Sequence, residues 1–476
     1  MRNVGPDVTV GYEPPVPIAL PVAPRRTRIA RRAKTVAVFA RRLGPIIRRR
    51  HRSPAEIGRR LRLAFEDLGA TYVKFGQLIG SSPGAFGQAM SDEFRSCLDT
   101  GPEVPFPDVR RAIERATGTR VEETFAELDP VAIAGASIAV VHRGRLHDGR
   151  DVAVKVLRPH IADRVALDLD IMEPLLKHVA MRGVGMAGPM YRFIRGFRTQ
   201  IAEELDLRNE ARTMAHFREL VDDEGLDMLV IPEPIIAAEQ VLVMTYLDGV
   251  AIDDVDAIAE LGHEPGPLMQ DMLRAWFLTG LRDGMFHGDI HAGNLLLLRD
   301  GRAGVIDWGI VGRLEPATQH VFRRFVEAVL GDATAWPEIV QFMKDNTPMP
   351  IEGDDLASEE KDEIESILTR PFGEVDLTGM FRGPGGRTVT TLTRAEKRAR
   401  RARLRELRQH MIGSGFAETQ LAQSNFLLFK QLLYFERYGK LYLSDVALMG
   451  DRQWLQHVLD LSRREDVVDR TDQPAG

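Results

Sequence analysis

Asp289, Asn294 and Asp307 lie in one short segment, "GMFHGDIHAGNLLLLRDGRAGVIDWGI", which covers residues 284–310. Asn294 follows Asp289 by five positions, and Asp307 comes eighteen positions after Asp289. Carboxylate and amide oxygens are ligands that Mg²⁺ prefers, and a carboxylate beside an attacking hydroxyl or water orients it. The segment therefore fits a metal-bound phosphate, a chemistry that needs further groups elsewhere in the chain.

The spacing of these residues is that of a phosphoryl-transfer site. Asp289 stands in the pattern H-x-D-x-x-x-x-N of kinases, in which the aspartate orients the nucleophile and Asn294 reaches a second Mg²⁺. The apolar runs "LLLL" and "GVI" predict two buried strands that deliver Asp307 to the main Mg²⁺. The other interpretation is a solvated acidic loop, which the ordered set of motifs disfavours.

Several other residues are interpreted as structural. His287 and His291 are expected to brace and orient the loop rather than to act as bases. Trp308 takes the usual Phe place of a DFG triplet, and Gly309 lets the backbone turn. The run "FLLFKQLLYFERYGKLYL" has aromatic residues at helical spacing, which favours core packing over a lipid groove.

A cation for the phosphates is expected upstream, on a strand. "DVAVKV" offers Lys155, which alternates with valines as in the kinase V-A-I-K motif. A buried lysine needs a carboxylate partner because an unpaired buried charge is costly, and Glu210 in "EELDLRNEAR" is our candidate. By itself Lys155 also fits a solubilising lysine on an edge strand.

The segment "AIAGASIAVVH" stands where protein kinases have a Gly-rich phosphate loop. Ala134, Gly135, Ala136 and Ser137 are predicted to line a turn over the nucleotide. Small side chains permit close approach of the backbone, although alanine is stiffer than glycine. Gly135 should loosen this loop, and the preferred nucleotide is left open.

Taken together, the chain resembles the UbiB/AarF (ADCK-type) atypical kinase family over roughly residues 61–330. The distinctive element of that family is a helical segment ahead of the kinase-like core with the motif K-x-G-Q. Lys74, Gly76 and Gln77 match it in "LGATYVKFGQLIG". The alanine-rich loop, "FHGDIHAGN" and "IDWG" match the family as well.

The resemblance also assigns roles to individual residues. The E-x-D motif of the family matches Glu204 and Asp206, and Glu210 lies four residues further on. The K-x-G-Q helices of such proteins fold over the cleft where a kinase accepts a polypeptide. Glu204 and Asp206 are then expected to hold Lys74 and Gln77 at the nucleotide site. The implied catalytic set is Asp289, Lys155, Glu210, Lys74 and Gln77.

For the function, the resemblance implies binding of ATP with Mg²⁺, and either hydrolysis or phosphate transfer to a small or lipid-like acceptor. It also implies a link to isoprenoid-quinone biosynthesis or membrane-lipid metabolism, with enzymes of those pathways as partners. Gly288 replaces the arginine of the HRD motif of regulated kinases, and no A-P-E triplet follows "DWGIVGRLEP". Both features disfavour a polypeptide substrate.

Two alternatives stay open. A soluble small-molecule phosphotransferase of the aminoglycoside or choline kinase type shares H-G-D-x-x-x-x-N, but the K-x-G-Q helices argue against it. A nucleotide-binding scaffold without turnover is disfavoured because all the metal ligands are present. The sequence indicates neither the acceptor nor the oligomeric state.

Strand-like runs followed by helix-rich sequence predict an α+β, bilobal protein-kinase-like fold, with a small β-rich N-lobe and a helical C-lobe. The expected divisions are a disordered leader at 1–24, a basic amphipathic segment at 25–60, the helical K-x-G-Q extension at 61–117, the N-lobe with a helical insertion at 118–250, and the C-lobe at 251–476 with a charged insertion at about 345–410.

Composition narrows the class of protein. The 476 residues are 44% hydrophobic and 28% charged, as in ordinary globular proteins. A single cysteine, Cys97, excludes an intrachain disulfide framework and suits a reducing cytoplasm. No apolar stretch is long enough for a transmembrane helix, and the first residues do not resemble a secretory signal. We expect a cytoplasmic protein.

The net charge of −6 hides a basic segment between Arg25 and Arg62, where Glu56 is the only acid. Apolar residues recur within it at roughly helical spacing. Such a stretch fits peripheral attachment to an anionic membrane surface. The other interpretations are a solvated helix packed on its own domain and a nonspecific nucleic-acid arm. No base-reading motif accompanies the segment, so no specific nucleic acid is expected.

Overall fold

The computed structural model describes residues 15–47, 53–80, 88–95, 97, 103–181, 187–346, 369–374, 420–447 and 449–471. The chain forms two compact units. The first comprises Met1–Asp248 and Gly304–Gly309, and the second comprises Gly249–Ala303 and Ile310–Gly476. Most of the expected leader and most of the expected charged insertion lie outside the described residues.

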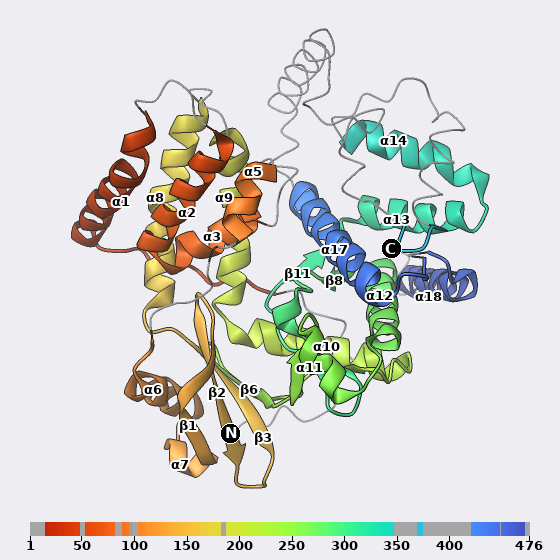
Figure 1. Cartoon of the computed structure of the whole chain (residues 1–476), viewed down its shortest axis with the longest axis horizontal. Coiled ribbons are helices and arrows are strands. Elements are labelled where there is room, and N and C mark those ends of the chain that lie inside the picture. The colour runs from red at the N-terminus through yellow and green to blue at the C-terminus, as the bar shows by residue number, and fades with distance from the viewer. Residues whose placement is uncertain are drawn as a thin grey trace. The chain divides into compact units, whose positions relative to one another are not determined.

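A group of helices makes up one part of the first unit, and Figure 1 shows them gathered beside one another. They are α1 (Arg25–Ile47), α2 (Pro54–Leu68), α3 (Ala70–Gly80), α5 (Gln88–Arg95), α8 (Ile161–Met181) and α9 (Ala187–Glu204). Phe65 of α2 lies edge to face with Tyr72 and Phe94, with ring centroids 5.6 and 5.3 Å away. Aromatic packing therefore joins α2, α3 and α5.

One buried ion pair connects α1 to α8. The Nε atom of Arg31 donates to Oδ1 of Asp168 at 2.6 Å, and its Nη2 donates to Oδ2 at 2.9 Å. The same Nη2 donates to the carbonyl oxygen of Leu68 at 2.7 Å, at the end of α2. Both side chains are buried, so this fork fixes three helices through charge-assisted bonds.

The other part of the first unit is an antiparallel sheet in the order β1-β2-β3-β6-β5. Its strands are β1 (Phe125–Gly135), β2 (Ala139–Leu146), β3 (Asp151–Leu157), β5 (Pro234–Ala237) and β6 (Val241–Thr245). Gly149, in the turn between β2 and β3, has a φ of 90° and so uses a conformation open to glycine. Lys155 pairs with Val141 on one side and Leu242 on the other, which makes β3 a central strand.

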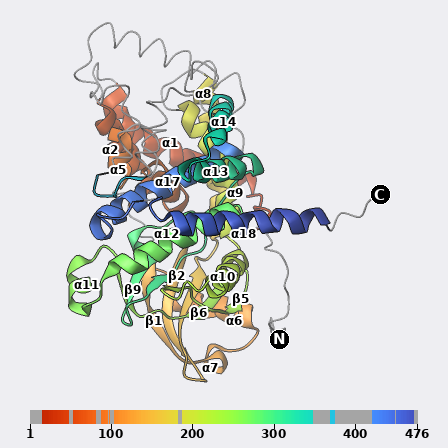
Figure 2. The ribbon, with the colours of Figure 1, turned by 90° about the vertical axis from the view of Figure 1, so that its right-hand side faces the viewer.

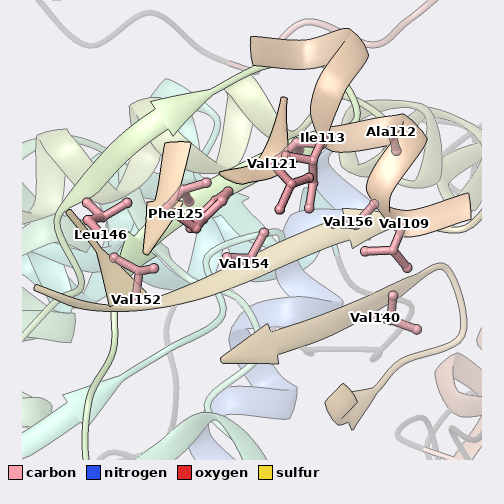
Figure 3. Packing of buried hydrophobic residues seen from close by; sticks show 12 residues of the cluster. Val109, Ala112, Ile113, Val121, Phe125, Val140, Leu146, Val152, Val154 and Val156 are labelled. Atoms are coloured by element: carbon pink, nitrogen blue, oxygen red, sulfur yellow. The ribbon is translucent and has the colours of Figure 1, made fainter. Parts of the chain in front are cut away.

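Alternate residues of β3 face the hydrophobic core of this sheet. Val152, Val154 and Val156 point to one face, where they pack against Val109 and Ile113 of α6 (Phe106–Thr117) (Figure 3). Lys155, on the alternate period, points to the other face. The remaining elements of the first unit are α7 (Val121–Thr124), α10 (Leu207–Asp223) and β4 (Leu229–Val230).

The second unit is mainly helical. The helices among its described residues are α11 (Val255–Leu261), α12 (Pro265–Arg282), α13 (Pro316–Val329), α14 (Trp336–Asn346), α17 (Gln420–Tyr442) and α18 (Arg452–Thr471), with 3-10 turns η1 (Ala292–Asn294) and η2 (Ala333–Ala335). Short strands are β7 (Gly249–Ala251), β8 (Met285–His287), β9 (Leu295–Leu298) and β11 (Val311–Arg313). β10 (Ala303–Val305) crosses the boundary between the units.

Packing in the second unit centres on α12. Trp276 lies edge to face with Phe286 of β8 and Phe435 of α17, with ring centroids 5.5 and 5.3 Å away. Figures 1 and 2 show α18 lying beside α12. β8 pairs with β11 and β7 with β9, and these short ladders frame the segment that contains Asp289.

The expected α+β class is confirmed, with strands concentrated in the first unit and helices dominating the second. The strands expected in the runs "LLLL" and "GVI" are present, as β9 and as part of β10. The finer domain boundaries stay a prediction. Among the helices of the described residues, none has the length and apolar content that crossing a bilayer requires.

Arg31→Met tests the buried ion pair. The change leaves the carboxylate of Asp168 buried without its arginine, so we expect the free energy of unfolding to fall by about 3–5 kcal/mol, measured by urea and thermal unfolding. Arg41→Met is the matched control, because Arg41 lies on the same helix but pairs with Asp67 at the surface, where a pair contributes little. Equal losses in the two variants would contradict this role for the buried pair.

Candidate active site

The ammonium group of Lys155 lies between two carboxylates in the first unit. Its Nζ atom is 2.8 Å from both oxygens of Glu210, in the first turn of α10. The same atom is 3.4 Å from Oδ1 of Asp307. The predicted pair of Lys155 and Glu210 therefore forms, and the position of β3 inside the sheet excludes a solubilising edge-strand lysine.

Asp307 and the residues after it are held close to this pair. Oδ1 of Asp307 accepts a hydrogen bond from the backbone N–H of Gly309 at 3.0 Å, and the N–H of Trp308 donates to Oε1 of Glu210 at 3.4 Å. The indole of Trp308 is buried against Phe217, with ring centroids 4.5 Å apart. The Asp307 side chain is 41% exposed, against 4% for Glu210, so its carboxylate is the one that a ligand can reach.

The K-x-G-Q lysine belongs to the same cluster. Nζ of Lys74, on α3, lies 2.6 Å from Oε2 of Glu204 at the end of α9. Cγ of Glu204 lies 3.8 Å from the place a Cβ would take at Gly309. Glu204 thus lies next to the turn that carries Asp307, and Gln77 lies half-buried one turn along α3 from Lys74.

Burial sets the electrostatics of the cluster. It opposes the charge of Lys155, but Asp307 and Glu210 outweigh it and hold the pKa of the ammonium above its ordinary value. Burial raises the pKa of Glu210 to about 7, with Lys155 opposing the shift and Asp307 adding to it. Burial also raises the pKa of Glu204 against the effect of Lys74. The cluster therefore holds three carboxylates against the two ammonium groups of Lys74 and Lys155, and its electrostatics favour the binding of a further cation.

Asp206, the other carboxylate of the E-x-D motif, caps a helix, and its expected contribution to holding Lys74 and Gln77 stays a prediction. Its Oδ1 accepts from the N–H of Arg208 at 3.1 Å, which caps the N-terminus of α10, and its carboxylate pairs with the guanidinium of Arg208. That pairing, together with the cap, holds the pKa of Asp206 below its usual value although burial acts in the opposite direction. Asp206 therefore fixes the start of the helix that carries Glu210, and Glu204 is the residue of the motif that lies within ion-pair distance of Lys74.

The alanine-rich segment departs from a glycine-type loop. Ala134 and Gly135 are the last residues of β1, opposite Val141 and Val140, and the φ of Gly135 is not in the left-handed region. The turn follows them, and the N–H of Ala136 donates to the carbonyl of Ala139 at 2.9 Å. The strand ladder thus continues through Gly135, so this glycine uses no conformation that would loosen the loop.

An arginine that the sequence did not single out holds this turn. Nε of Arg158 donates to the carbonyl of Ala136 at 3.0 Å, and its backbone N–H donates to the carbonyl of Ile138 at 2.8 Å. Ser137 is buried between these contacts. The signal in the sequence is the position of Arg158, directly after the strand that carries Lys155.

In the second unit, Asp289 lies between β8 and η1 in a tightly bonded loop. Its N–H donates to Nδ1 of His287 at 3.1 Å, and Nδ2 of Asn294 donates to its carbonyl oxygen at 3.1 Å. Nδ1 of His291 accepts from the N–H of Gly293 at 3.0 Å. The two histidines make the kind of contacts expected of braces for this loop.

Gly288 has no room for a side chain. A Cβ there would lie 2.9 Å from Cγ2 of Ile310 and 3.2 Å from the backbone nitrogen of Gly312. Its N–H donates to the carbonyl of Ile310 at 2.9 Å. An arginine like that of regulated kinases therefore cannot occupy this position without moving β11.

Gln431, which the sequence alone does not single out, is fully buried on α17. Its amide nitrogen donates to the carbonyl of Gly288 at 2.6 Å, and its amide oxygen accepts from the N–H of Ile290 at 3.0 Å. The available signal was a glutamine next to Lys430 in a stretch of helix whose aromatic spacing indicates core packing.

No three His, Cys, Asp or Glu side chains converge as a metal-binding group in the described part of the chain. Mg²⁺ at a nucleotide is commonly held by one or two carboxylates together with phosphate oxygens and waters, so it does not need such a group. The chemistry of the donors, an accessible Asp307 in a cluster short of positive charge, fits that arrangement.

Residues 96–339 match the family model described as the ABC1 atypical kinase-like domain. An uncharacterized protein of Mycobacterium tuberculosis is 34% identical over 394 residues, which cover 82% of this chain and 75% of that protein. The chain belongs to this family. A chloroplastic aarF domain-containing protein kinase of Arabidopsis thaliana, also uncharacterized, is 30% identical over 403 residues, 83% of this chain and 73% of that protein.

A probable protein kinase UbiB of Xylella fastidiosa is 31% identical over 330 residues, which cover 67% of this chain and 59% of that protein. The predicted membership of the UbiB/AarF family is thereby confirmed, and with it the kinase-like fold. The family is kinase-like, and the cluster around Lys155 is built of residue types that phosphoryl transfer uses.

Gly76→Ala tests why the K-x-G-Q motif has a glycine. An added Cβ would lie 2.9 Å from Cδ1 of Phe94 and 3.2 Å from Sγ of Cys97, so α3 must shift away from α5. We expect a loss of about 1–3 kcal/mol in the free energy of unfolding. Gly44→Ala is the control, because nothing lies within 4 Å of its added Cβ, and it should cause no loss. Similar stabilities for the two variants would contradict the close packing at Gly76.

Proposed function

We propose that this protein binds ATP with Mg²⁺ and hydrolyses it, or transfers its terminal phosphate to a small or lipid-like acceptor. The observation that carries the proposal is the cluster in which Lys155 joins a buried Glu210 to an accessible Asp307. A lysine held between a buried and an accessible carboxylate is an arrangement suited to a metal-bound polyphosphate.

Lys155 neutralises the phosphates in this proposal. Its raised pKa keeps the ammonium charged at neutral pH, so it is available to phosphate oxygens. Glu210 fixes the direction of the Lys155 ammonium through two hydrogen bonds of 2.8 Å. The backbone of Lys155 is held in turn by the strands on both sides of β3. The ammonium is thus oriented before the nucleotide arrives, which lowers the entropic cost of binding.

Asp307 and Asn294 hold the metal in this proposal, and Asp289 orients the attacking hydroxyl or water. Mg²⁺, when bound, neutralises the charge that develops on the phosphates. The backbone of Asp289 is fixed because its N–H is bonded to His287 and its carbonyl to Asn294. Its carboxylate is therefore presented from a rigid loop. Asn294 is buried and bonded to the same loop, so the metal ligand and the orienting group are held together.

Two features support an acceptor other than a polypeptide. The K-x-G-Q lysine is tied to Glu204 inside the charged cluster, so the K-x-G-Q helix lies where it can restrict access to Asp307. Gly288 leaves no room for the arginine with which regulated kinases bind a phosphorylated activation loop. The family resemblance supports isoprenoid-quinone or membrane-lipid metabolism as the setting.

Asp307→Asn tests the proposed chemistry. The amide keeps the shape of the side chain but removes the negative charge that binds the metal, so Mg²⁺-dependent ATP hydrolysis should fall by a factor on the order of 10³. Asp300→Asn is the matched control, because Asp300 lies in the same segment but is exposed and paired with Arg302. We expect its rate to stay within twofold of the unaltered protein. Undiminished turnover in Asp307→Asn would refute the metal-binding role.

Peripheral attachment to an anionic membrane is part of the same proposal, and α1 supports it. Ile29 and Val36 are 57% and 66% exposed, and with the exposed Ala33 and Ala40 they form an outward stripe at helical spacing. Exposed basic residues flank the stripe, namely Arg25, Arg26, Arg32 and Lys34. An apolar face with basic flanks suits the interface of anionic lipids.

Replacing both Ile29 and Val36 by aspartate should weaken co-sedimentation with phosphatidylglycerol vesicles at least tenfold, because two charges would enter the apolar stripe. The melting temperature should hardly change, since both side chains are exposed. Val255→Asp, at another exposed valine on α11, is the control and should bind as the unaltered protein does. Equal vesicle binding by the double variant would contradict the assignment to α1.

A further inference from the structure

Among the described side chains of α17, Gln431 binds the backbone on both sides of Asp289. Gln431 donates from Nε2 to the carbonyl oxygen of Gly288 at 2.6 Å and accepts at Oε1 from the N–H of Ile290 at 3.0 Å. These two backbone groups belong to the residues directly before and after Asp289. Gln431 is 0% exposed, so neither bond competes with bulk water.

The two backbone groups have no partner in a strand ladder. β8 ends at His287, and the N–H of Gly288 already donates to the carbonyl of Ile310. η1 begins only at Ala292. Buried backbone groups without a partner are costly, and in this loop one amide side chain satisfies two of them.

Together with bonds already described, Gln431 completes the fixation of this stretch of backbone. The N–H of Asp289 is bound to His287 and its carbonyl to Asn294, while the carbonyl before it and the N–H after it are both bound to Gln431. Both peptide planes that flank Asp289 are therefore fixed. Since these planes set the direction of its Cα–Cβ bond, they also set where its carboxylate points.

We propose that Gln431 is a positioning residue for Asp289, which acts on the rate of phosphoryl transfer rather than on nucleotide affinity. The proposal rests on the proposed function of Asp289. An amide suits the role because it donates and accepts at once without carrying a charge. Lys155, Glu210 and Asp307 lie outside its contacts, and Asn294 is bonded to Asp289 and His291 rather than to Gln431, so nucleotide binding through these residues should not depend on it.

Gln431→Met removes both hydrogen bonds while keeping the length and volume of the side chain. We expect kcat for Mg²⁺-ATP hydrolysis, measured with and without phosphatidylglycerol vesicles, to fall at least tenfold. The Kd for Mg²⁺-ADP should stay within twofold. A loss confined to kcat separates positioning from a general loss of folded protein, which would lower binding capacity as well.

Gln319→Met is the matched control in the same unit. Its Nε2 donates to the carbonyls of Leu281 and Arg282 at 3.0 and 3.1 Å, at the end of α12, so it too joins a helix to two backbone groups. The melting temperature should fall in both variants, but kcat should stay within twofold in Gln319→Met. A kcat unchanged in Gln431→Met, or lowered equally in both variants, overturns the proposal.

A second substitution covers the case in which Gln431→Met does not fold. In Gln431→Glu the neutral carboxyl can make both bonds, whereas the ionised carboxylate cannot donate to Gly288. The ratio of its kcat to that of the unaltered protein should therefore fall as pH rises through the pKa of the new carboxyl. A ratio that stays high at pH values where NMR shows the new carboxyl to be ionised overturns the proposal.

Failure of the proposed function would be visible in the unaltered protein, which would then hydrolyse no ATP. In that case hydrogen exchange decides whether Gln431 fixes the loop. The amide of Ile290 should exchange at least tenfold faster in Gln431→Met than in the unaltered protein, with no change in Gln319→Met. Equal exchange of that amide in all three proteins overturns the positioning role.

Discussion

The constraint on which the first unit depends is a lysine charge inside a β-sheet. β3 is a central strand, and its backbone groups are hydrogen-bonded to β2 and β6. This pairing supplies no negative charge for the ammonium of Lys155. A carboxylate has to come from another element, and α10, which packs on β5 and β6, delivers Glu210 to within 2.8 Å. Asp206 caps that helix, so one residue of the E-x-D motif sets the position of the next carboxylate along the chain.

The second unit differs, because its contacts fix the backbone around Asp289 instead of neutralising a buried charge. Asp289 lies in a loop between two short strands, where a backbone would ordinarily be free to rotate. His287, Asn294 and Gln431 replace the missing ladder by bonding to the backbone itself. Rigidity thus comes from side chains, and it is complete only when α17 is in place.

The sequence predicts those parts of the site whose partner follows from charge or period. Alternation with three valines puts Lys155 on the face away from the core, and its buried charge requires a carboxylate, so the pair with Glu210 could be named in advance. The partner of Asp206 could not be named in advance, because a carboxylate one residue before a helix can either cap that helix or pair with a distant residue. Gln431 lies 141 residues from Ile290, and nothing local says which backbone it meets.

The energetics of the charged cluster argue that it exists for a ligand rather than for the fold. Replacing a buried ion pair by well-packed apolar residues is often neutral or stabilising, so Lys155 with Glu210 and Lys74 with Glu204 contribute weakly to stability at best. Asp307 adds a further carboxylate, which raises the pKa of Glu210 and makes the cluster harder to keep ionised. A fold selected for stability alone would lose this negative charge. A site that receives a cation together with an anionic phosphate would need it, because the metal offsets the carboxylate and the lysine offsets the phosphate.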